Sequence, residues 1–417
     1  MSVITMCPRV FGKLARVVVA SALVSVPGAR SAFTQDSAAP GLNLSLTVTA
    51  NTDDTVAAAA GGEAGAVSAE QAPAGGGPMT FLESTEIFGL VDAYYDWYST
   101  KPSGDAPLRN FDTKHNQFGL SLLEFGLAKI PTADSRGGFR LDLDYGPTTA
   151  MVHAVEPGGA AIFQNIQQAY MSYLAPAGNG LQFDVGKFVT QHGAEVIEAK
   201  DNWNYSRSIL FAWAIPYYHM GVRATYAASD KVTIAGALVN GWNNVVENNE
   251  AKTFGAMLVL KPTASLTLTQ NYMGGPEQAD NDDDWRHLSD TTIMYTATDA
   301  LSLMVNYDYG RENVAGGSVH WQGVAGYAKF IASDRFAVIP RVEWYQDEDG
   351  FTTGTAQTLK EFTVTGEVTL APRLLWRMEY RGDFSDVDFF EKHDGTFRDN
   401  QHSIGFGLLY SFSSKTP

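Results

Sequence analysis

Apolar and polar residues alternate with a period of two along most of the chain from Glu86 onward. In the run from Arg373 to Arg381, one side carries leucine, tryptophan, methionine and tyrosine, and the other side is mostly charged. Similar runs cover 139–145, 301–309, 361–368 and 403–412. Such alternation predicts β-strands with one apolar and one polar face. Both a soluble β-sandwich and a membrane β-barrel satisfy this pattern.

The lengths of the connections separate these two architectures. The pattern predicts about sixteen strands, at 86–98, 116–129, 138–146, 164–174, 180–188, 216–226, 231–240, 251–260, 264–273, 289–296, 300–310, 319–331, 335–346, 358–370, 373–384 and 400–412. Connections after odd strands are long, and connections after even strands are short, with 130–137 the longest of the short set. Sorting of this kind is typical of bacterial outer-membrane barrels, and a sandwich has no reason for it. We therefore predict an all-β fold, a transmembrane antiparallel up-and-down β-barrel with long external loops and short periplasmic turns.

The N-terminal part of the chain differs in composition and lacks the alternating pattern. Arg9, Lys13 and Arg16 precede an apolar run at 17–24, and small residues follow, which predicts an export signal peptide over residues 1–31. Residues 32–80 are rich in Ala, Gly, Ser and Thr and predict a flexible leader. Residues 81–417 then form the predicted barrel domain. A signal peptide followed by a barrel predicts the outer membrane of a Gram-negative bacterium as the location.

Composition narrows the functional classes. The 29 basic and 46 acidic residues give a net charge of −17, which argues against a nucleic-acid partner. Beyond the N-terminus no apolar run approaches the roughly 18 residues of a membrane-spanning helix. The single cysteine, Cys7, lies in the predicted signal peptide, so the exported chain needs no disulfide in an oxidising compartment.

The connection at 189–215 is the longest of the set and the third external loop of the predicted barrel. It carries apolar residues such as Ile209, Leu210 and Phe211, which an exposed loop would not favour. We expect it to fold inward and narrow the pore, although a solvated external loop is the alternative. Rings of opposed charges filter solutes by size and charge. The predicted constriction consists of His192, Glu195, Glu198, Lys200, Asp201 and Arg207.

The polar faces of the predicted strands supply candidate residues for the pore wall. They are Arg140, Asp142, Asp144, Arg223, Asp308, Arg341, Glu343, Arg377, Glu379 and Arg381. In one interpretation these charges orient solutes; in the other they pair with each other and hold a wet lumen together. Both can hold at once. The acidic balance favours a mild cation preference at the mouth, although the narrowest ring of the pore would dominate.

Short motifs in a fixed order resemble the β-barrel porin family of the OmpL-like type. They lie at 186–188, 195–198, 204–208, 216–223, 239–243, 343–345 and 379–381, and the resemblance covers about Phe88 to Phe412. It implies an outer-membrane channel. The expected partners are outer-membrane lipid and small hydrophilic solutes or ions, with assembly as a homotrimer left open.

Catalytic and cofactor motifs are missing from the sequence. The eight histidines are scattered without paired ligand spacing, and no phosphate-binding loop or nucleophile elbow is present. The acidic run from Asp280 to Asp284 lacks the glycine and the closing glutamate of an EF-hand. We therefore expect no enzyme activity, no cofactor and no metal site. Passive diffusion through a lumen is the predicted function; a structural or adhesive barrel with a closed lumen is the alternative, and a barrel hydrolase is third.

Overall fold

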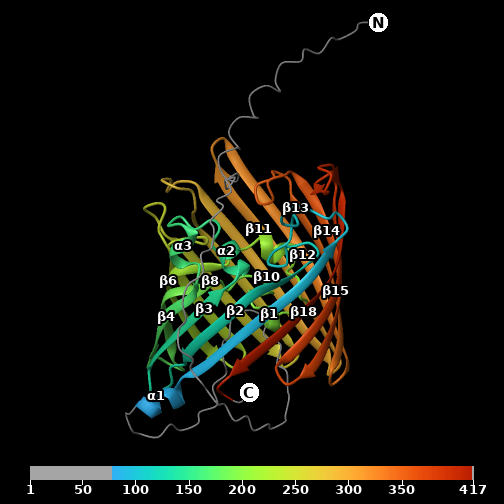
Figure 1. Cartoon of the computed structure of the whole chain (residues 1–417). Helices are drawn as coiled ribbons and strands as arrows, with labels where there is room; N and C mark the ends of the chain where they lie inside the picture. Colours follow the sequence, from blue (N-terminus) through green and yellow to red (C-terminus); the bar gives the residue numbers. More distant parts are fainter. Residues whose placement is uncertain (1–77, 416–417) are drawn as a thin grey trace, which may run out of the picture. The chain divides into compact units, whose positions relative to one another are not determined.

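Backbone pairing in residues 78–415, the part of the chain that the computed structural model describes, closes into a barrel of sixteen antiparallel strands (Figure 1). Each strand pairs with its neighbours in sequence, and β1 closes the ring against β18. The barrel strands are β1 (Glu86–Tyr98), β2 (Gln117–Lys129), β3 (Gly137–Tyr145), β4 (Ile166–Ala175), β5 (Leu181–Val189), β6 (Tyr218–Ser229), β7 (Val232–Val239), β8 (Thr253–Thr263), β9 (Leu266–Pro276), β10 (Trp285–Thr298), β11 (Leu301–Val314), β12 (Gly317–Ser333), β13 (Phe336–Asp347), β14 (Gln357–Ala371), β15 (Leu374–Ser385) and β18 (Asn400–Ser413).

Short elements fill the connections. The described helices are α1 (Pro78–Ser84), α2 (Pro147–Val152), α3 (Ala160–Phe163), the 3-10 helix η1 (Ala199–Asp201) and α4 (Ile209–Trp213). β16 (Phe390–Glu391) and β17 (Phe397–Arg398) pair only with each other, inside the connection between β15 and β18. None of the helices in the described range combines the length and apolar character needed to cross a membrane.

The predicted fold class is confirmed, and most strand boundaries agree within three residues. One connection differs from the expected sorting. The predicted long loop at 311–318 is wrong, because β11 and β12 extend to Val314 and Gly317 and leave a two-residue turn. Gly316 in this turn has a φ of 95°, a conformation that favours glycine. The predicted signal peptide and nearly all of the predicted leader lie outside the described residues.

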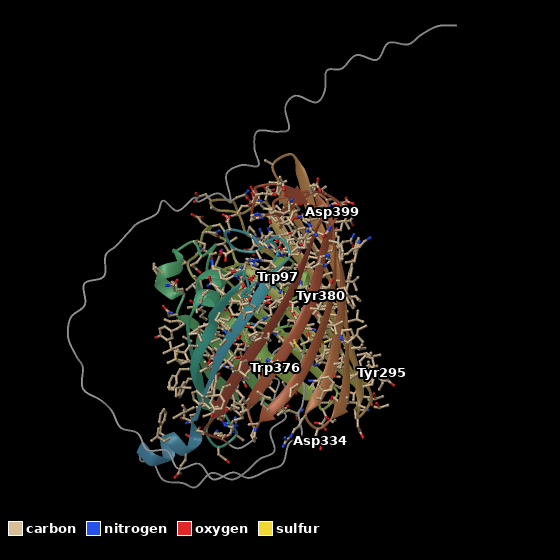
Figure 2. All side chains as sticks on the ribbon, turned by 45° about the vertical axis from the view of Figure 1, so that its right-hand side comes forward. Trp97, Tyr295, Asp334, Trp376, Tyr380 and Asp399 are labelled. Atoms are coloured by element: carbon tan, nitrogen blue, oxygen red, sulfur yellow. The ribbon has the colours of Figure 1, made fainter. Side chains whose placement is uncertain are left out.

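The outer face of the barrel is apolar and ringed by aromatic side chains. On β11, for example, Val305 and Tyr307 are exposed while Asn306 and Asp308 between them are buried. A closed barrel has only its interior in which to bury a side chain, so the buried set points inward and the apolar set outward. In Figure 2 the aromatic residues Trp97, Tyr380, Trp376 and Tyr295 lie on the barrel between the rim that carries Asp399 and the opposite rim, which carries Asp334. Aromatic side chains on the outer face are typical of a barrel surface that meets lipid and its headgroups.

The inner face is polar and crowded. Buried charged side chains line β1, β2, β3, β5, β10, β11 and β13 to β15, as expected for a face that lipid does not contact. α2 packs against β2, and its residues Thr148, Thr149 and Val152 are buried. On the side of β6 to β9, a small cavity is lined by Ala237 and Gly255 together with larger side chains such as Arg223 and Met273.

A charge placed on the lipid-facing side of β11 tests this assignment of faces. Val305→Arg introduces a guanidinium near the middle of the apolar belt, and we expect it to lower the free energy of unfolding by about 2–4 kcal/mol. The measurement is denaturant unfolding in lipid vesicles. Asn313→Arg, on the same face near the end of the strand, should cost only about 0–1 kcal/mol. Equal effects of the two substitutions would show that the outward face of β11 does not lie in lipid.

Candidate functional site

The connection between β5 and β6, residues 190–217, enters the barrel interior. It begins beside β9 and β11, where the Nδ2 of Asn271 donates to the Gln191 carbonyl (3.0 Å) and the backbone N–H of Ala194 donates to the Oδ1 of Asn306 (3.2 Å). Both asparagines belong to the inward-facing set. The connection then runs along the inner faces of β12 to β15 and returns to β6 through α4. We call residues 190–217 the third loop.

Arg341 on β13 is the centre of the attachment between the third loop and the wall. Its side chain is 0% exposed, and its Nη1 lies 3.0 Å from the Oε1 of Glu195. The same guanidinium donates to the carbonyl (2.7 Å) and hydroxyl (3.0 Å) of Ser206. Behind it lie the wall carboxylates Glu343 and Glu361, at 3.4 and 3.2 Å from its Nε. A desolvated guanidinium needs such a set of acceptors. The third loop provides four of them, since the Arg207 carbonyl also accepts from Arg341 at 3.4 Å.

Arg377 on β15 holds the next part of the third loop. It donates to the carbonyl oxygens of Ala199 and Asn202, both at 2.5 Å. Glu367 on β14 balances its charge at 2.6 Å. A turn of 3-10 helix exposes carbonyl oxygens at its end, and this guanidinium satisfies them.

Arg381, also on β15, completes the row of arginines. Its Nη1 donates to the carbonyl of Arg207 at 2.6 Å, and Asp383 lies 2.7 Å from its Nη2. Three wall arginines thus bind backbone carbonyls or side chains of the third loop, with exposed side-chain fractions of 1% or less. Besides pairing with wall carboxylates, these arginines attach the third loop, a role that neither interpretation of the wall charges included.

Two wall carboxylates receive N–H groups from the third loop. Glu343 accepts from the backbone of Ile209 (3.0 Å) and Leu210 (3.3 Å), at the start of α4. Glu379 accepts from the backbone N–H of Tyr205 at 3.0 Å. These N–H groups have no partner within the helix or turn, so the carboxylates satisfy donors that burial would otherwise leave unpaired.

Apolar packing holds the same stretch in place. Ile209, Leu210 and Phe211 belong to a buried cluster that includes wall side chains of β12, β13 and β14. The wall is also shaped for the third loop at two glycines. A β-carbon at Gly407 would overlap the ring of Tyr205, and one at Gly323 would crowd the Leu210 side chain. The close approach of loop and wall therefore requires residues without a side chain at these positions.

The tip of the third loop remains in contact with water. Lys200 and Asp201 in η1 form an ion pair whose side chains are 25% and 44% exposed. Glu198 accepts a hydrogen bond from Gln167 on β4, which lies five strands around the ring from β15. The segment that carries Glu198, Lys200 and Asp201 is therefore held by both β4 and β15. Glu195 and Arg207 of the predicted constriction are buried and paired, and Arg207 lies over the ring of Phe111.

The remaining predicted wall residues lie in other parts of the interior. Arg140 pairs with Asp142 at 2.8 Å, and Arg223 on β6 pairs with Asp184 at 2.9 Å. Asp144 is buried, and its two carboxylate oxygens accept no hydrogen bond from another described residue. Asp308 lies on β11, outside the row of arginines on β13 and β15.

Sequence reasoning missed several residues that contact the third loop. Asn204 donates to the Ile339 carbonyl at 3.1 Å and to the Thr365 hydroxyl at 2.7 Å, and Tyr205 donates to Asp92 at 2.8 Å. The order of residues contains no signal for these pairs, because the partners are more than 100 positions apart. Among the described residues, no group of three or more His, Cys, Asp or Glu side chains is placed to hold a metal ion.

Comparison with known protein families identifies the family to which this barrel belongs. Residues 84–412 match the family described as "Putative beta-barrel porin-2, OmpL-like". The chain belongs to this family. A search of curated proteins found no matching relative. As a member, the chain is a porin-like barrel of the bacterial outer membrane.

Solved structures with the same fold include three bacterial outer-membrane proteins. The anion-selective porin from Comamonas acidovorans has a TM-score of 0.55 and 11% identity, over 79% of this chain and 99% of that chain. The outer membrane channel DcaP of Acinetobacter baumannii has a TM-score of 0.53 and 12% identity, over 79% and 97%. The trimer form of OmpT from Vibrio cholerae has a TM-score of 0.50 and 10% identity, over 79% and 99%. At such identities the likeness concerns the fold.

Removing the guanidinium group of Arg341 should strongly lower the stability of the barrel. Arg341→Ala leaves Glu195, Glu343 and Glu361 buried without their common partner, and we expect a loss of about 3–5 kcal/mol in unfolding free energy. Denaturant unfolding in vesicles measures it. Lys252→Ala, which removes an exposed ion pair with Glu247, should cost no more than about 1 kcal/mol. A loss for Arg341→Ala as small as that of the control would contradict the attachment.

Acid should weaken the docking of the third loop through His192. Burial, and to a lesser degree His219, lowers the pKa of His192 from 6.5 to about 3. A lowered folded pKa means that the histidine contributes stability above pH 6.5 and that this contribution falls as the pH drops toward 3.

The comparison of wild type with His192→Gln isolates this effect from the titration of carboxylates. Unfolding measured from pH 7 to pH 4 should show a steeper loss of stability in the wild type than in the variant. Parallel curves would show that His192 is accessible to protons in the folded barrel.

Proposed function

We propose that this chain is an outer-membrane porin through which small hydrophilic solutes or ions diffuse passively, in a water-filled lumen narrowed by the third loop. The observation that carries the proposal is the attachment of the third loop to the inner wall by Arg341, Arg377 and Arg381. A loop held by buried guanidinium groups keeps a constant position, as a size filter requires. Family membership supports the same conclusion.

Within this proposal the residues of the constriction have two roles. Glu195 and Arg207 fix the third loop, because they are buried and paired with wall or loop groups. Glu198, Lys200 and Asp201 are the residues that a passing solute meets, because they lie at the tip. His192 lies between the loop and the wall of β6 to β9, beside a small cavity that Arg223 also lines. The proposed porin acts without catalysis.

Assembly as a homotrimer belongs to the same proposal. The trimer form of the Vibrio cholerae protein supports it by fold alone. The proposed partners are outer-membrane lipid around the apolar belt and small solutes or ions inside. The proposed location is the outer membrane, reached through the predicted signal peptide.

A second candidate is a structural barrel with a closed lumen. The buried apolar cluster favours it. Leu108 and Phe111, from the connection between β1 and β2, belong to this cluster together with side chains of the third loop. Such a cluster excludes water from part of the cross-section. If the lumen is open, this cluster holds the third loop against the wall beside the channel. If the lumen is closed, the cluster blocks the whole cross-section.

Planar-bilayer recording decides between the two. The refolded full-length protein should give stable conductance steps with a defined reversal potential in a salt gradient. Lys200→Glu should shift permeability toward cations and Asp201→Lys toward anions, each by about twofold or more, because a charge at a narrow site changes the local potential by several kT. The matched control is Asp283→Lys in the external acidic run, which should change the ratio little.

Two results would contradict the proposal. Absence of conductance in a sample with the heat-dependent gel mobility of a folded barrel would favour the closed lumen. Conductance that responds to Asp283→Lys but not to the tip variants would place the narrowest point at the rim instead of the third loop.

A further inference from the structure

A row of carboxylate and amide side chains crosses the inner face of β9, β10 and β11. Asn271 pairs in register with Asp290, and Asp290 pairs with Asp308. Register partners in antiparallel strands have β-carbons about 5 Å apart, so these three side chains are immediate neighbours. Thr292 and Asn306 form the adjacent row. All five side chains are buried, and both aspartates are 0% exposed.

The two aspartates lack the basic partners that other wall carboxylates have. Asp290 accepts from the Nδ2 of Asn271 at 2.6 Å and from the Nδ2 of Asn306 at 2.7 Å. Asp308 has a long contact of 3.5 Å with the same Asn306 amide, and its carboxyl group also lies within hydrogen-bond reach of the Asp290 carboxyl group. Within residues 78–415, neither forms an ion pair with Lys, Arg or His, whereas Asp142, Asp184 and Glu361 each pair with arginine. The acidic Glu343 adds to the negative field at Asp308.

Three oxygens of this cluster are buried without a hydrogen-bond partner among the described residues. They are the Oδ2 of Asp308, the Oδ1 of Asn271 and the hydroxyl of Thr292. The orientation of the Asn271 amide follows from its contacts, because its nitrogen donates both to Asp290 and to the Gln191 carbonyl. Burying oxygens without hydrogen-bond donors, next to two carboxylates without a basic partner, costs folding free energy unless a positive group satisfies them.

A hard cation satisfies this set of groups better than a proton does. One proton shared between Asp290 and Asp308 neutralises one charge and satisfies one oxygen. A divalent cation balances both charges and accepts the amide and hydroxyl oxygens as ligands as well. Carboxylate, amide carbonyl and hydroxyl oxygens in a flexible set are the ligands that Ca²⁺ prefers, whereas Mg²⁺ demands a stricter octahedron.

We propose that Asp290, Asp308, Asn271 and Thr292 bind a divalent cation of the calcium type on the inner wall. This set combines two carboxylates with neutral amide and hydroxyl oxygens. It therefore differs from the groups of three or more His, Cys, Asp or Glu side chains that are absent from the described residues. The site lies under the start of the third loop, because Asn271 holds the Gln191 carbonyl and Asn306 holds the Ala194 N–H. Cation binding thus orders the two asparagines that attach the third loop, whether or not the lumen conducts.

Calorimetric titration of Ca²⁺ into the refolded, chelator-treated full chain tests the site. The wild type should show one class of tight binding. Asp308→Asn, which keeps the shape and removes the charge, should weaken binding by about tenfold or more, and Asp290→Asn should do the same. Ca²⁺ should also raise the unfolding temperature of the wild type, and it should not raise that of Asp308→Asn.

Two control variants separate this site from other acidic groups. Glu124→Gln removes a buried wall carboxylate that also has an unpartnered oxygen, and Asp283→Asn removes an external one. Both should bind Ca²⁺ as the wild type does. Heat-dependent gel mobility shows that each variant is folded.

Three outcomes would overturn the proposal. The wild type could bind no Ca²⁺. Binding could survive both Asp308→Asn and Asp290→Asn, or disappear in Asp283→Asn. Finally, Asp308→Asn could stabilise the barrel in chelator while the wild type gains nothing from Ca²⁺, which would show that the pair holds a proton. Because titration and conductance are separate measurements, failure of the cation site leaves the porin proposal unaffected, and the reverse also holds.

Discussion

The structure of the interior depends on the desolvation of three guanidinium groups. Arg341, Arg377 and Arg381 project from β13 and β15 into a space from which water is largely excluded, so each needs several acceptors. Neighbouring strands supply carboxylates, but the remaining donors reach backbone carbonyls and side chains of the third loop. The wall and the third loop therefore form one hydrogen-bonded unit, and the position of the loop follows from the charges of the wall.

The distribution of charge explains why the two sides of the interior differ. Near β13 to β15, carboxylates and arginines alternate and the third loop is bound tightly. Near β9 to β11, the carboxylates Asp290 and Asp308 have only amide donors. Toward β6 to β9 the wall carries small side chains such as Ala237. The third loop contacts the second region at Gln191 and Ala194 and the first region at 195–210 before it returns to β6. It therefore links a region whose carboxylates lack basic partners to a region whose arginines need acceptors.

Much of the barrel could be predicted from local patterns. Alternation of apolar and polar residues placed the strands, and the parity of the connections distinguished a barrel from a sandwich. The predicted loop at 311–318 is wrong because Glu312 and Asn313 are polar and yet belong to the strand ladder, which continues to Val314. Polar residues near the rim of a barrel face water on either side, so their pattern does not mark the end of a strand.

The sequence by itself determined the strands, their faces and the order in which they pair, because a period of two and short turns are local properties. It also indicated that the third loop carries apolar mass and charge. Only the tertiary structure decided which charges meet. Glu195 and Arg341 are 146 residues apart, and barrel closure brings them together. Their partnership depends on strand register around the whole ring, which no short stretch of sequence contains.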